Sequence, residues 1–101
     1  MIIGTDQNLD HHIESSETVV VYFWAEWCQP CKRYSPIIDE ISREKTILVA
    51  KIDVDANPLQ TQKYSVSTIP TTILFNQGKE IKRITGASPK HVVLNTFKDW
   101  M

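Results

Sequence analysis

The chain has 101 residues, of which 42% are hydrophobic and 23% charged, and its formal net charge is −1. This length accommodates one hydrophobic core, so we predict a single domain spanning residues 1–101. The balanced charge argues against nucleic acid or an anionic membrane surface as a partner. The apolar runs are too short to cross a bilayer, and the first ten residues lack the basic start and apolar core of a secretory signal. We therefore expect a cytoplasmic protein, in a compartment that keeps thiols reduced.

The N-terminal part of the chain predicts a strand, a helix and a second strand. Residues 1–3 form a candidate short strand. Thr5 or Asp6 is placed to cap a polar helix that runs to about Ser16. Residues 18–25 are β-branched and aromatic without alternation. This pattern predicts a strand that is buried on both faces.

The middle of the chain repeats this alternation of helix and strand. Pro36 lies within a helical stripe and predicts a kink rather than a stop, because the periodicity continues past it. Residues 46–54 predict a second buried strand, and Asn57 followed by Pro58 predicts the capped start of a short helix to about Tyr64. The helix that contains Pro36 begins near Cys28, and its apolar stripe consists of Tyr34, Ile37, Ile38 and Ile41.

The C-terminal part predicts a hairpin and a last helix. Residues 71–75 and 80–85 flank a turn and predict antiparallel strands. Ser88 and Pro89 predict the start of a helix with one apolar side, made of Val93, Phe97 and Trp100. The predicted order is βαβαβαββα, which indicates an α/β fold: a three-layer sandwich with a central mixed sheet and helices on both faces.

The two cysteines of the chain, Cys28 and Cys31, are separated by two residues. In an extended chain these positions lie roughly 10 Å apart, which is too far for a disulfide. In the first turn of a helix they lie about 5–6 Å apart, within the range a disulfide tolerates. Because a strand precedes the two cysteines and a helix follows, the pair is predicted at the carboxyl end of a strand. Ligand-binding and catalytic residues of such sheets lie at these strand ends. This context favours a redox pair.

The start of a helix makes the two thiols unequal. Cys28, at the N-terminal end, faces unpaired backbone N–H groups and the positive end of the helix dipole, which favour its thiolate. Cys31 lies one turn deeper and is expected to be covered. We therefore assign Cys28 as the attacking nucleophile and Cys31 as the resolving thiol. Pro30 fixes the backbone between them and removes one N–H group.

Two other interpretations of the cysteine pair remain open. Cys28 and Cys31 are also compatible with a role as small hydrophobic core residues. A zinc site needs four ligands, and the only obvious further candidates are His11, His12 and His91. Two of these histidines are adjacent, which is poor spacing for a shared metal. We therefore predict no metal site.

Three segments give the sequence a resemblance to the thioredoxin family. Residues 23–32, "FWAEWCQPCK", resemble the family's W-C-G-P-C-K active-site segment. Residues 51–58, "KIDVDANP", resemble its third-strand segment, and residues 68–87, "TIPTTILFNQGKEIKRITGA", resemble its cis-proline loop, hairpin and following glycine. The similarity covers nearly the whole chain.

The resemblance implies a substrate-binding surface beside the cysteines. Pro70 matches the family's cis-proline, and the preceding Ile69 would offer its backbone to an extended substrate segment. Gly86 matches a glycine that lines the substrate groove, with Ala87 beside it. Trp27 would form the rim of the site next to the nucleophile.

The sequence departs from the family at several positions. Gln29 replaces the glycine between the cysteines, and we expect a reduction potential near the reducing end of the family's range. Tyr22 occupies the position of the family's buried aspartate, whose lysine partner is matched by Lys51. The lysine is expected either to share a hydrogen bond with Tyr22 or to extend to solvent. A phenol is a poor base at neutral pH, so we expect slow or water-assisted resolution. Ser65 and Thr68 replace glycines before the cis-proline and are expected to reshape the groove.

The resemblance predicts an enzyme, a thiol–disulfide oxidoreductase that reduces protein disulfides and serves cell redox homeostasis. It implies a monomer without a bound cofactor, which receives electrons from a thioredoxin reductase. One alternative is a specialised oxidoreductase with a restricted set of partners. A glutathione-dependent glutaredoxin is disfavoured because the active-site segment does not match. A third alternative is a binding module whose cysteines are idle.

Overall fold

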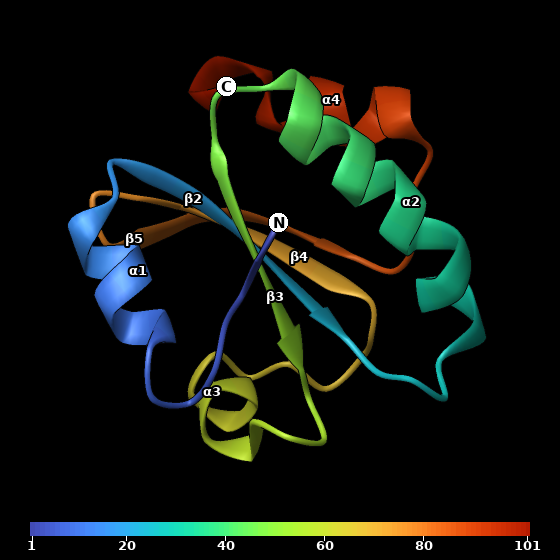
Figure 1. Ribbon diagram of the computed structural model, residues 1–101. Helices are drawn as coiled ribbons and strands as arrows, with labels where there is room; N and C mark the ends of the chain where they lie inside the picture. Colours follow the sequence, from blue (N-terminus) through green and yellow to red (C-terminus); the bar gives the residue numbers. More distant parts are fainter.

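The computed structural model describes residues 1–101 and contains a five-stranded sheet with helices on both faces (Figure 1). Helix α2 continues through Pro36, as the apolar periodicity predicts. The order βαβαβαββα is confirmed, with one 3-10 turn added at the C-terminus. The elements are β1 (Ile2–Ile3), α1 (Leu9–Ser15), β2 (Thr18–Trp24), α2 (Gln29–Glu44), β3 (Leu48–Asp53), α3 (Pro58–Lys63), β4 (Thr71–Asn76), β5 (Lys79–Thr85), α4 (Lys90–Phe97) and the 3-10 helix η1 (Lys98–Trp100).

The sheet is mixed, and its strand order is β1-β3-β2-β4-β5. Strands β1 and β2 run parallel to β3, whereas β4 runs antiparallel to β2 and β5 antiparallel to β4. Strand β2 is therefore central, and its five inner residues are all buried, which confirms the prediction of a strand covered on both faces. Because β2 and β3 are parallel, both end at the same edge of the sheet, where ligands and chemistry gather in folds of this kind.

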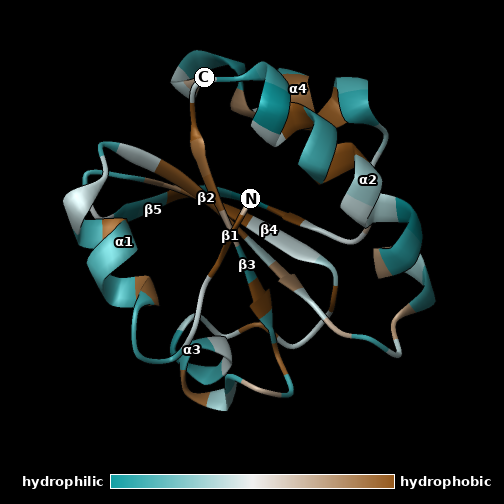
Figure 2. Cartoon of the chain, in the orientation of Figure 1, coloured by the Kyte–Doolittle hydropathy of each residue, from teal (hydrophilic) through white to brown (hydrophobic).

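Each face of the sheet carries its own core. Helices α1 and α3 cover one face, called the α1 face below, and helices α2 and α4 cover the other, the α2 face (Figure 1). Side chains alternate along a strand, so Phe23 of β2 points to the α1 face while its neighbour Tyr22 points to the α2 face. The central strands are mainly hydrophobic, whereas the edge strand β5 and the outer sides of α1 and α2 are mainly hydrophilic, as Figure 2 shows. This distribution is that of a sheet buried between two amphipathic layers.

The helix starts differ from the sequence prediction at the N-terminus and in α3. Helix α1 begins at Leu9, and Asn8, its N-cap residue, makes no side-chain capping bond. The predicted cap Thr5 instead accepts the N–H groups of Gln7 and Asn8 with its hydroxyl, at 3.2 and 3.1 Å, in the turn that leads into the helix. The Asp6 carboxylate instead accepts two N–H groups from the first turn of α3, at 3.3 and 2.9 Å. The predicted cap, Asn57, makes no side-chain bond to that helix and accepts the Asp6 N–H at 2.9 Å. The cap of α3 comes from a distant loop, which local sequence signals do not reveal.

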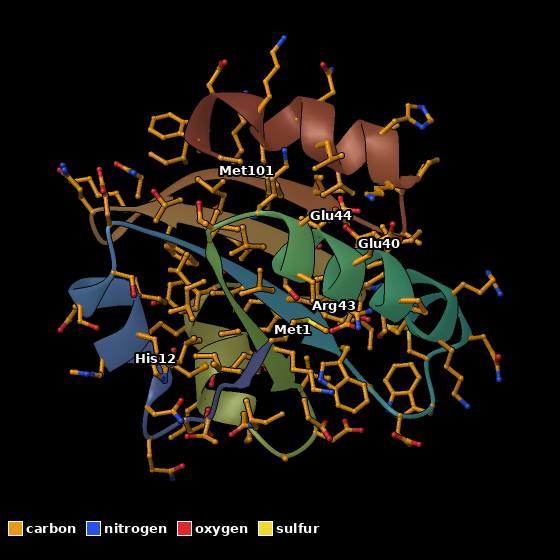
Figure 3. The ribbon with its side chains drawn as sticks, turned by 45° about the horizontal axis from the view of Figure 1, so that its top comes forward. Met1, His12, Glu40, Arg43, Glu44 and Met101 are labelled. Carbon is orange, nitrogen blue, oxygen red and sulfur yellow. A yellow bond between two sulfur atoms is a disulfide. The ribbon has the colours of Figure 1, made fainter.

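Helix α4 is attached to α2 by a pair of ion bridges. It begins at Lys90 with Pro89 as its N-cap, one residue later than predicted, and the hydroxyl of Ser88 makes no capping bond. The Lys90 ammonium lies 2.8 Å from Glu40 and 2.7 Å from Glu44 on the facing side of α2 (Figure 3). These bridges hold the start of α4, and with it the loop that follows β5, against the active-site helix.

Candidate active site

The cysteine pair lies where the sequence analysis placed it, directly after β2 and at the start of α2. Cys28 is the N-cap residue of α2, with extended backbone angles, and the helix begins at the next residue. Cys28 and Cys31 form a disulfide, and their Cα atoms lie 5.2 Å apart. The distance matches the 5–6 Å expected for one helical turn. The two-residue spacing closes into a disulfide because the helix begins at the first cysteine.

The first turn of α2 presents a hydrogen-bond donor to the first sulfur. The backbone N–H of Cys31 donates to Sγ of Cys28 at 3.2 Å. Pro30 stands between them and contributes no N–H group, so this donor is directed at the sulfur without competition from that residue. A donor and the positive end of a helix both stabilise a thiolate and lower its pKa. The geometry therefore favours Cys28 as the attacking sulfur when the disulfide is open.

Both cysteines of the pair are almost fully buried. Cys31 is 1% exposed, as predicted, but Cys28 is only 3% exposed. They form a small buried cluster with Ala25, against which Ile69 packs. Only a small part of the Cys28 surface is therefore accessible to a substrate.

Trp27 forms an exposed edge of the site, as the resemblance implies. Its side chain is 65% exposed, which is exceptional for a tryptophan in this chain. The indole N–H donates to the Asp55 carboxylate at 2.8 Å, which fixes the ring. Asp55 follows β3, and sequence reasoning did not identify it as part of the site, because no local pattern links it to Trp27.

A cis peptide bond lies beside the cysteines. The bond between Ile69 and Pro70 is cis, which confirms the prediction for Pro70. The carbonyl oxygen of Pro70 accepts the N–H of Gly86 at 2.7 Å, so the loop after β5 is attached to the cis-proline loop. Gly86 has a φ of +92°, a conformation that favours glycine, and no atom lies within 4 Å of where a Cβ would project. Exposed Ala87 follows it. Four of the site residues inferred from the resemblance, Ile69, Pro70, Gly86 and Ala87, thus lie on two loops that are joined by a hydrogen bond.

Tyr22 does not pair with Lys51. Its hydroxyl lies 2.7 Å from the hydroxyl of Ser35 and donates to the carbonyl oxygen of Cys31 at 3.2 Å. Burial raises the pKa of the Tyr22 phenol, and the bond to Ser35 offsets part of that shift. Both partners of Tyr22 lie on α2, and the sequence analysis did not consider Ser35. At neutral pH this pair of hydroxyls is neutral and supplies no base for Cys31.

Lys51 neither bonds to Tyr22 nor extends freely into solvent, the two arrangements that the sequence analysis predicts. Its ammonium lies 5.0 Å above the ring of Trp24, and no carboxylate lies within ion-pair distance. The expected hydrogen bond with Tyr22 is therefore wrong, and the aromatic ring takes the place of a counter-ion. The buried indole N–H of the same tryptophan has no hydrogen-bond partner.

A cavity of about 220 Å³ has Cys31 among its lining residues. It is open to solvent and has one acidic and one basic residue among its walls. Its lining residues are Trp24, Ala25, Glu26, Cys31, Lys32 and Ser35. Through this cavity water can approach Cys31. No buried carboxylate lies beside Cys31 to accept its proton.

The loop before the cis-proline is strained at one of the positions where the family has glycine. Ser65 has a φ of 55°, in the left-handed region that disfavours residues with a Cβ. Thr68, the other departure, lies in the bend that contains the cis-proline, and its carbonyl oxygen accepts the hydroxyl of Thr71. The loop thus keeps a backbone conformation suited to glycine although serine occupies the position.

No group of three or more histidine, cysteine, aspartate or glutamate side chains has an arrangement that suits a metal ion. No helix is both long and apolar enough to span a membrane. The arrangement that the structure does provide is a disulfide at a helix start, flanked by an exposed indole and a cis-proline loop. It defines a site for thiol–disulfide exchange.

Comparison with known proteins supports this class and identifies the family. The sequence model of the thioredoxin family matches residues 1–99, so the chain belongs to the thioredoxin family. It is 48% identical over 89 residues to a thioredoxin of Mycolicibacterium smegmatis, covering 84% of this chain and 80% of that protein. It is 44% identical over 89 residues to a bifunctional thioredoxin reductase/thioredoxin of Mycobacterium leprae, covering 86% of this chain and 19% of that protein.

The fold agrees with solved structures of the same family. The thioredoxin of Plasmodium falciparum superimposes with a TM-score of 0.94 at 31% sequence identity, and the match covers 100% of both chains. The predicted three-layer fold is therefore confirmed, and the protein is a thiol–disulfide oxidoreductase of the thioredoxin type.

Proposed function

We propose that residues 1–101 act as one domain that reduces disulfides in proteins. The observation that carries the proposal is the disulfide between Cys28 and Cys31 at the start of α2, beside the cis bond at Pro70. In this arrangement the redox-active group is the cysteine pair itself, so the reaction requires no bound cofactor.

The first step is attack by Cys28 on a substrate disulfide. Its thiolate, supported by the N–H of Cys31 at 3.2 Å, forms a bond to one substrate sulfur. The substrate S–S bond breaks, and the other substrate sulfur leaves as a thiolate and takes a proton from solvent. The product is a mixed disulfide between Cys28 and the substrate.

The second step is resolution by Cys31. Its thiol loses a proton, and the sulfur attacks Sγ of Cys28 in the mixed disulfide. The bond to the substrate breaks, the second substrate thiol is released, and the disulfide between the two cysteines closes. Two electrons have then passed from the protein to the substrate. Because Tyr22 is a neutral phenol, we propose that the proton leaves through the water-accessible cavity beside Cys31, which makes this step slow.

Substrate binding is assigned to the two loops around the disulfide. Trp27 supports one edge, and the backbone of Ile69 pairs with an extended substrate segment next to Pro70. Gly86 and Ala87 line the continuation of this groove. This assignment is supported by the exposure of Trp27 and by the hydrogen bond between the two loops. Gln29 and Pro30, between the cysteines, tune the reduction potential.

The electrons for re-reduction of the disulfide are proposed to come from a thioredoxin reductase. The relative from Mycobacterium leprae is described as a reductase and a thioredoxin in one chain, which supports this partnership. A reductase of this kind operates in a compartment that keeps thiols reduced, so we propose a cytoplasmic, monomeric reductant that contributes to redox homeostasis.

Trapping of the mixed disulfide tests the two cysteine roles. Cys31→Ser should accumulate a covalent complex with insulin, detected by mass spectrometry, because the resolving step is removed. Cys28→Ser is the matched control and should accumulate none. Equal trapping by both variants would contradict the assignment of the nucleophile. If neither variant trapped substrate and the wild type did not reduce insulin, the cysteines would be idle and the protein a binding module.

A restricted set of partners is the second candidate, and three departures favour it. Tyr22 replaces the buried carboxylate, and Ser65 and Thr68 alter the loop before the cis-proline. A thioredoxin reductase assay with NADPH consumption separates the candidates. Steady turnover with both insulin and the reductase supports a general reductant, whereas insulin reduction without recharging by the reductase supports the specialised protein.

A further inference from the structure

A second cavity, of about 280 Å³, lies between α2 and the loop that joins β5 to α4. Buried Tyr34 lies among the residues that form it, and an arginine stands at its edge. Its lining residues are Arg33, Tyr34, Ile37, Ala87, Ser88 and Pro89. The surface of this cavity is mainly apolar. It shares no lining residue with the cavity beside Cys31 and is therefore a separate cavity.

This cavity continues the proposed substrate groove. Ile69 packs against the cysteine cluster, and the carbonyl oxygen of Pro70 accepts the N–H of Gly86 at 2.7 Å. The next residue, Ala87, already belongs to the wall of the cavity. A segment that lies across the cis-proline loop and passes Gly86 therefore reaches the cavity without leaving the surface. On the other wall, Arg33 stands two residues after Cys31 on α2.

Arg33 carries a charge that the protein does not neutralise. Its guanidinium lies in no ion pair and in no side-chain hydrogen bond, whereas Arg43 and Arg83 each pair with a carboxylate. The acidic residues on the α4 side of α2 are already occupied, because Glu40 and Glu44 both bind Lys90. Lys90 holds the pKa of the Glu40 carboxyl below its usual range, which is consistent with a formed pair.

We propose that this cavity is a specificity subsite for an extended segment of the substrate protein with one apolar side chain and one carboxylate. The apolar side chain occupies the cavity, and the carboxylate pairs with Arg33, which presents a planar fork of donors suited to it. The subsite acts on substrates of the exchange reaction and therefore rests on the proposed function. The favoured substrates are therefore proteins with one apolar and one acidic residue close in sequence to the disulfide that is reduced.

Paired peptide disulfides test the subsite. Each probe is a blocked peptide with one cysteine, joined by a disulfide to an identical copy, and carrying leucine and glutamate two and four residues from the cysteine. One series places this pair before the cysteine and another after it, and each has a partner peptide with glutamine in place of glutamate. The measured quantity is the single-turnover rate constant of reduction by the reduced protein, expressed as the ratio of glutamate to glutamine peptide.

The wild-type protein should reduce the glutamate peptide about threefold to fivefold faster in one of the two series, the effect of one exposed ion pair. Arg33→Met should bring that ratio to one, and Arg33→Glu should invert it. Lys32→Met is the matched control, since it removes the same charge one residue away but on the wall of the other cavity, and it should keep the ratio. High salt should reduce the ratio because it screens the pair.

Equal rates for glutamate and glutamine peptides in both series would overturn the subsite and leave the oxidoreductase function intact. A preference that survives Arg33→Met, or that Lys32→Met abolishes equally, would show a general electrostatic effect and would also overturn it. If the reduced protein reduced none of the peptides, the subsite and the proposed function would both be wrong.

Discussion

The two faces of the sheet are built from different kinds of side chain. The hydrophobic cluster of the α1 face contains no tyrosine among its buried residues: Leu9, Ile13, Val19, Val21, Phe23, Ala50, Ile52, Ile73 and Phe75. The core of the α2 face contains two tyrosines among its aliphatic residues: Val20, Tyr22, Tyr34, Ile38, Ile41, Val49, Leu74, Val93 and Phe97. The two fully buried tyrosines thus lie on the side that carries the active-site helix.

The two tyrosines of the α2 face are fully buried and meet edge to face, with ring centroids 5.6 Å apart. The hydroxyl of Tyr34 bonds to Thr72 on the sheet at 2.8 Å, whereas that of Tyr22 bonds to Ser35 and the Cys31 carbonyl on α2. Burial raises the pKa of both phenols, so both are neutral at physiological pH. The α2 face therefore positions the helix through neutral hydroxyls.

Tyr22→Asp should produce the largest change on the α2 face. It removes a buried ring and places a carboxyl group at a position with 0% exposure, so the free energy of unfolding should fall by about 5 kcal/mol at pH 7. Burial raises the pKa of the introduced carboxyl, so the loss should be smaller near pH 4 and grow with pH up to that raised value. Urea unfolding at several pH values measures it.

The same variant should accelerate resolution. A carboxylate near Cys31 provides a base that the phenol lacks, and release of substrate from the mixed disulfide should be about tenfold faster or more. Stopped-flow measurement on folded protein, with Tyr22→Phe as the control that adds no base, determines the rate. An unchanged rate in Tyr22→Asp would contradict the claim that this chain resolves slowly for lack of a base.

Phe23→Ala makes the corresponding change on the α1 face. Phe23 is 0% exposed and belongs to the hydrophobic cluster of the α1 face, so its loss should lower the free energy of unfolding by about 3–5 kcal/mol. The residues of this hydrophobic cluster form no side-chain hydrogen bond to α2, so the rates of attack and resolution in the folded variant should remain those of the wild type. A changed resolution rate would contradict the claim that resolution depends on the side chains of the α2 face.

Asp10→Asn at the rim of the α1 face should have the smallest effect. The Asp10 carboxylate lies 2.9 Å from the Lys63 ammonium, and this hydrogen bond holds the pKa of the carboxyl below its usual value. A lowered pKa means that the pair stabilises the fold above pH 4 or so and that this contribution is lost as the pH falls through the folded-state pKa. Both side chains are largely exposed, so only about 0.2–0.5 kcal/mol is expected, and it should vanish in high salt. A larger loss at neutral pH would contradict this account of the rim.

Much of the architecture could be predicted because its signals are local. The unbroken apolar run of β2 predicts burial on both faces, and the helical period of α2 continues through Pro36. The cysteine spacing, combined with a helix start, predicts the disulfide. The cis bond at Pro70 came from the resemblance to the family, since the residues around it carry no local signal for it.

The remaining features depend on contacts between distant segments. The cap of α3 is Asp6, which lies far from it in sequence, and the partner of Tyr22 is Ser35 rather than Lys51, the residue opposite it on the neighbouring strand. The bond between Trp27 and Asp55 likewise joins two loops. Periodicity assigns a residue to a face, but it does not specify which of several polar groups on that face approaches it.

The reduction potential of the pair Cys28 and Cys31 tests the central claim most directly. Equilibration in defined thiol–disulfide buffers, followed by alkylation and mass spectrometry, measures it. The account predicts a value near the −270 mV or so of reducing thioredoxins, because Pro30 is retained and Gln29 adds no charge beside the nucleophile. A value above about −200 mV would contradict the role as a reductant and indicate an oxidase or isomerase.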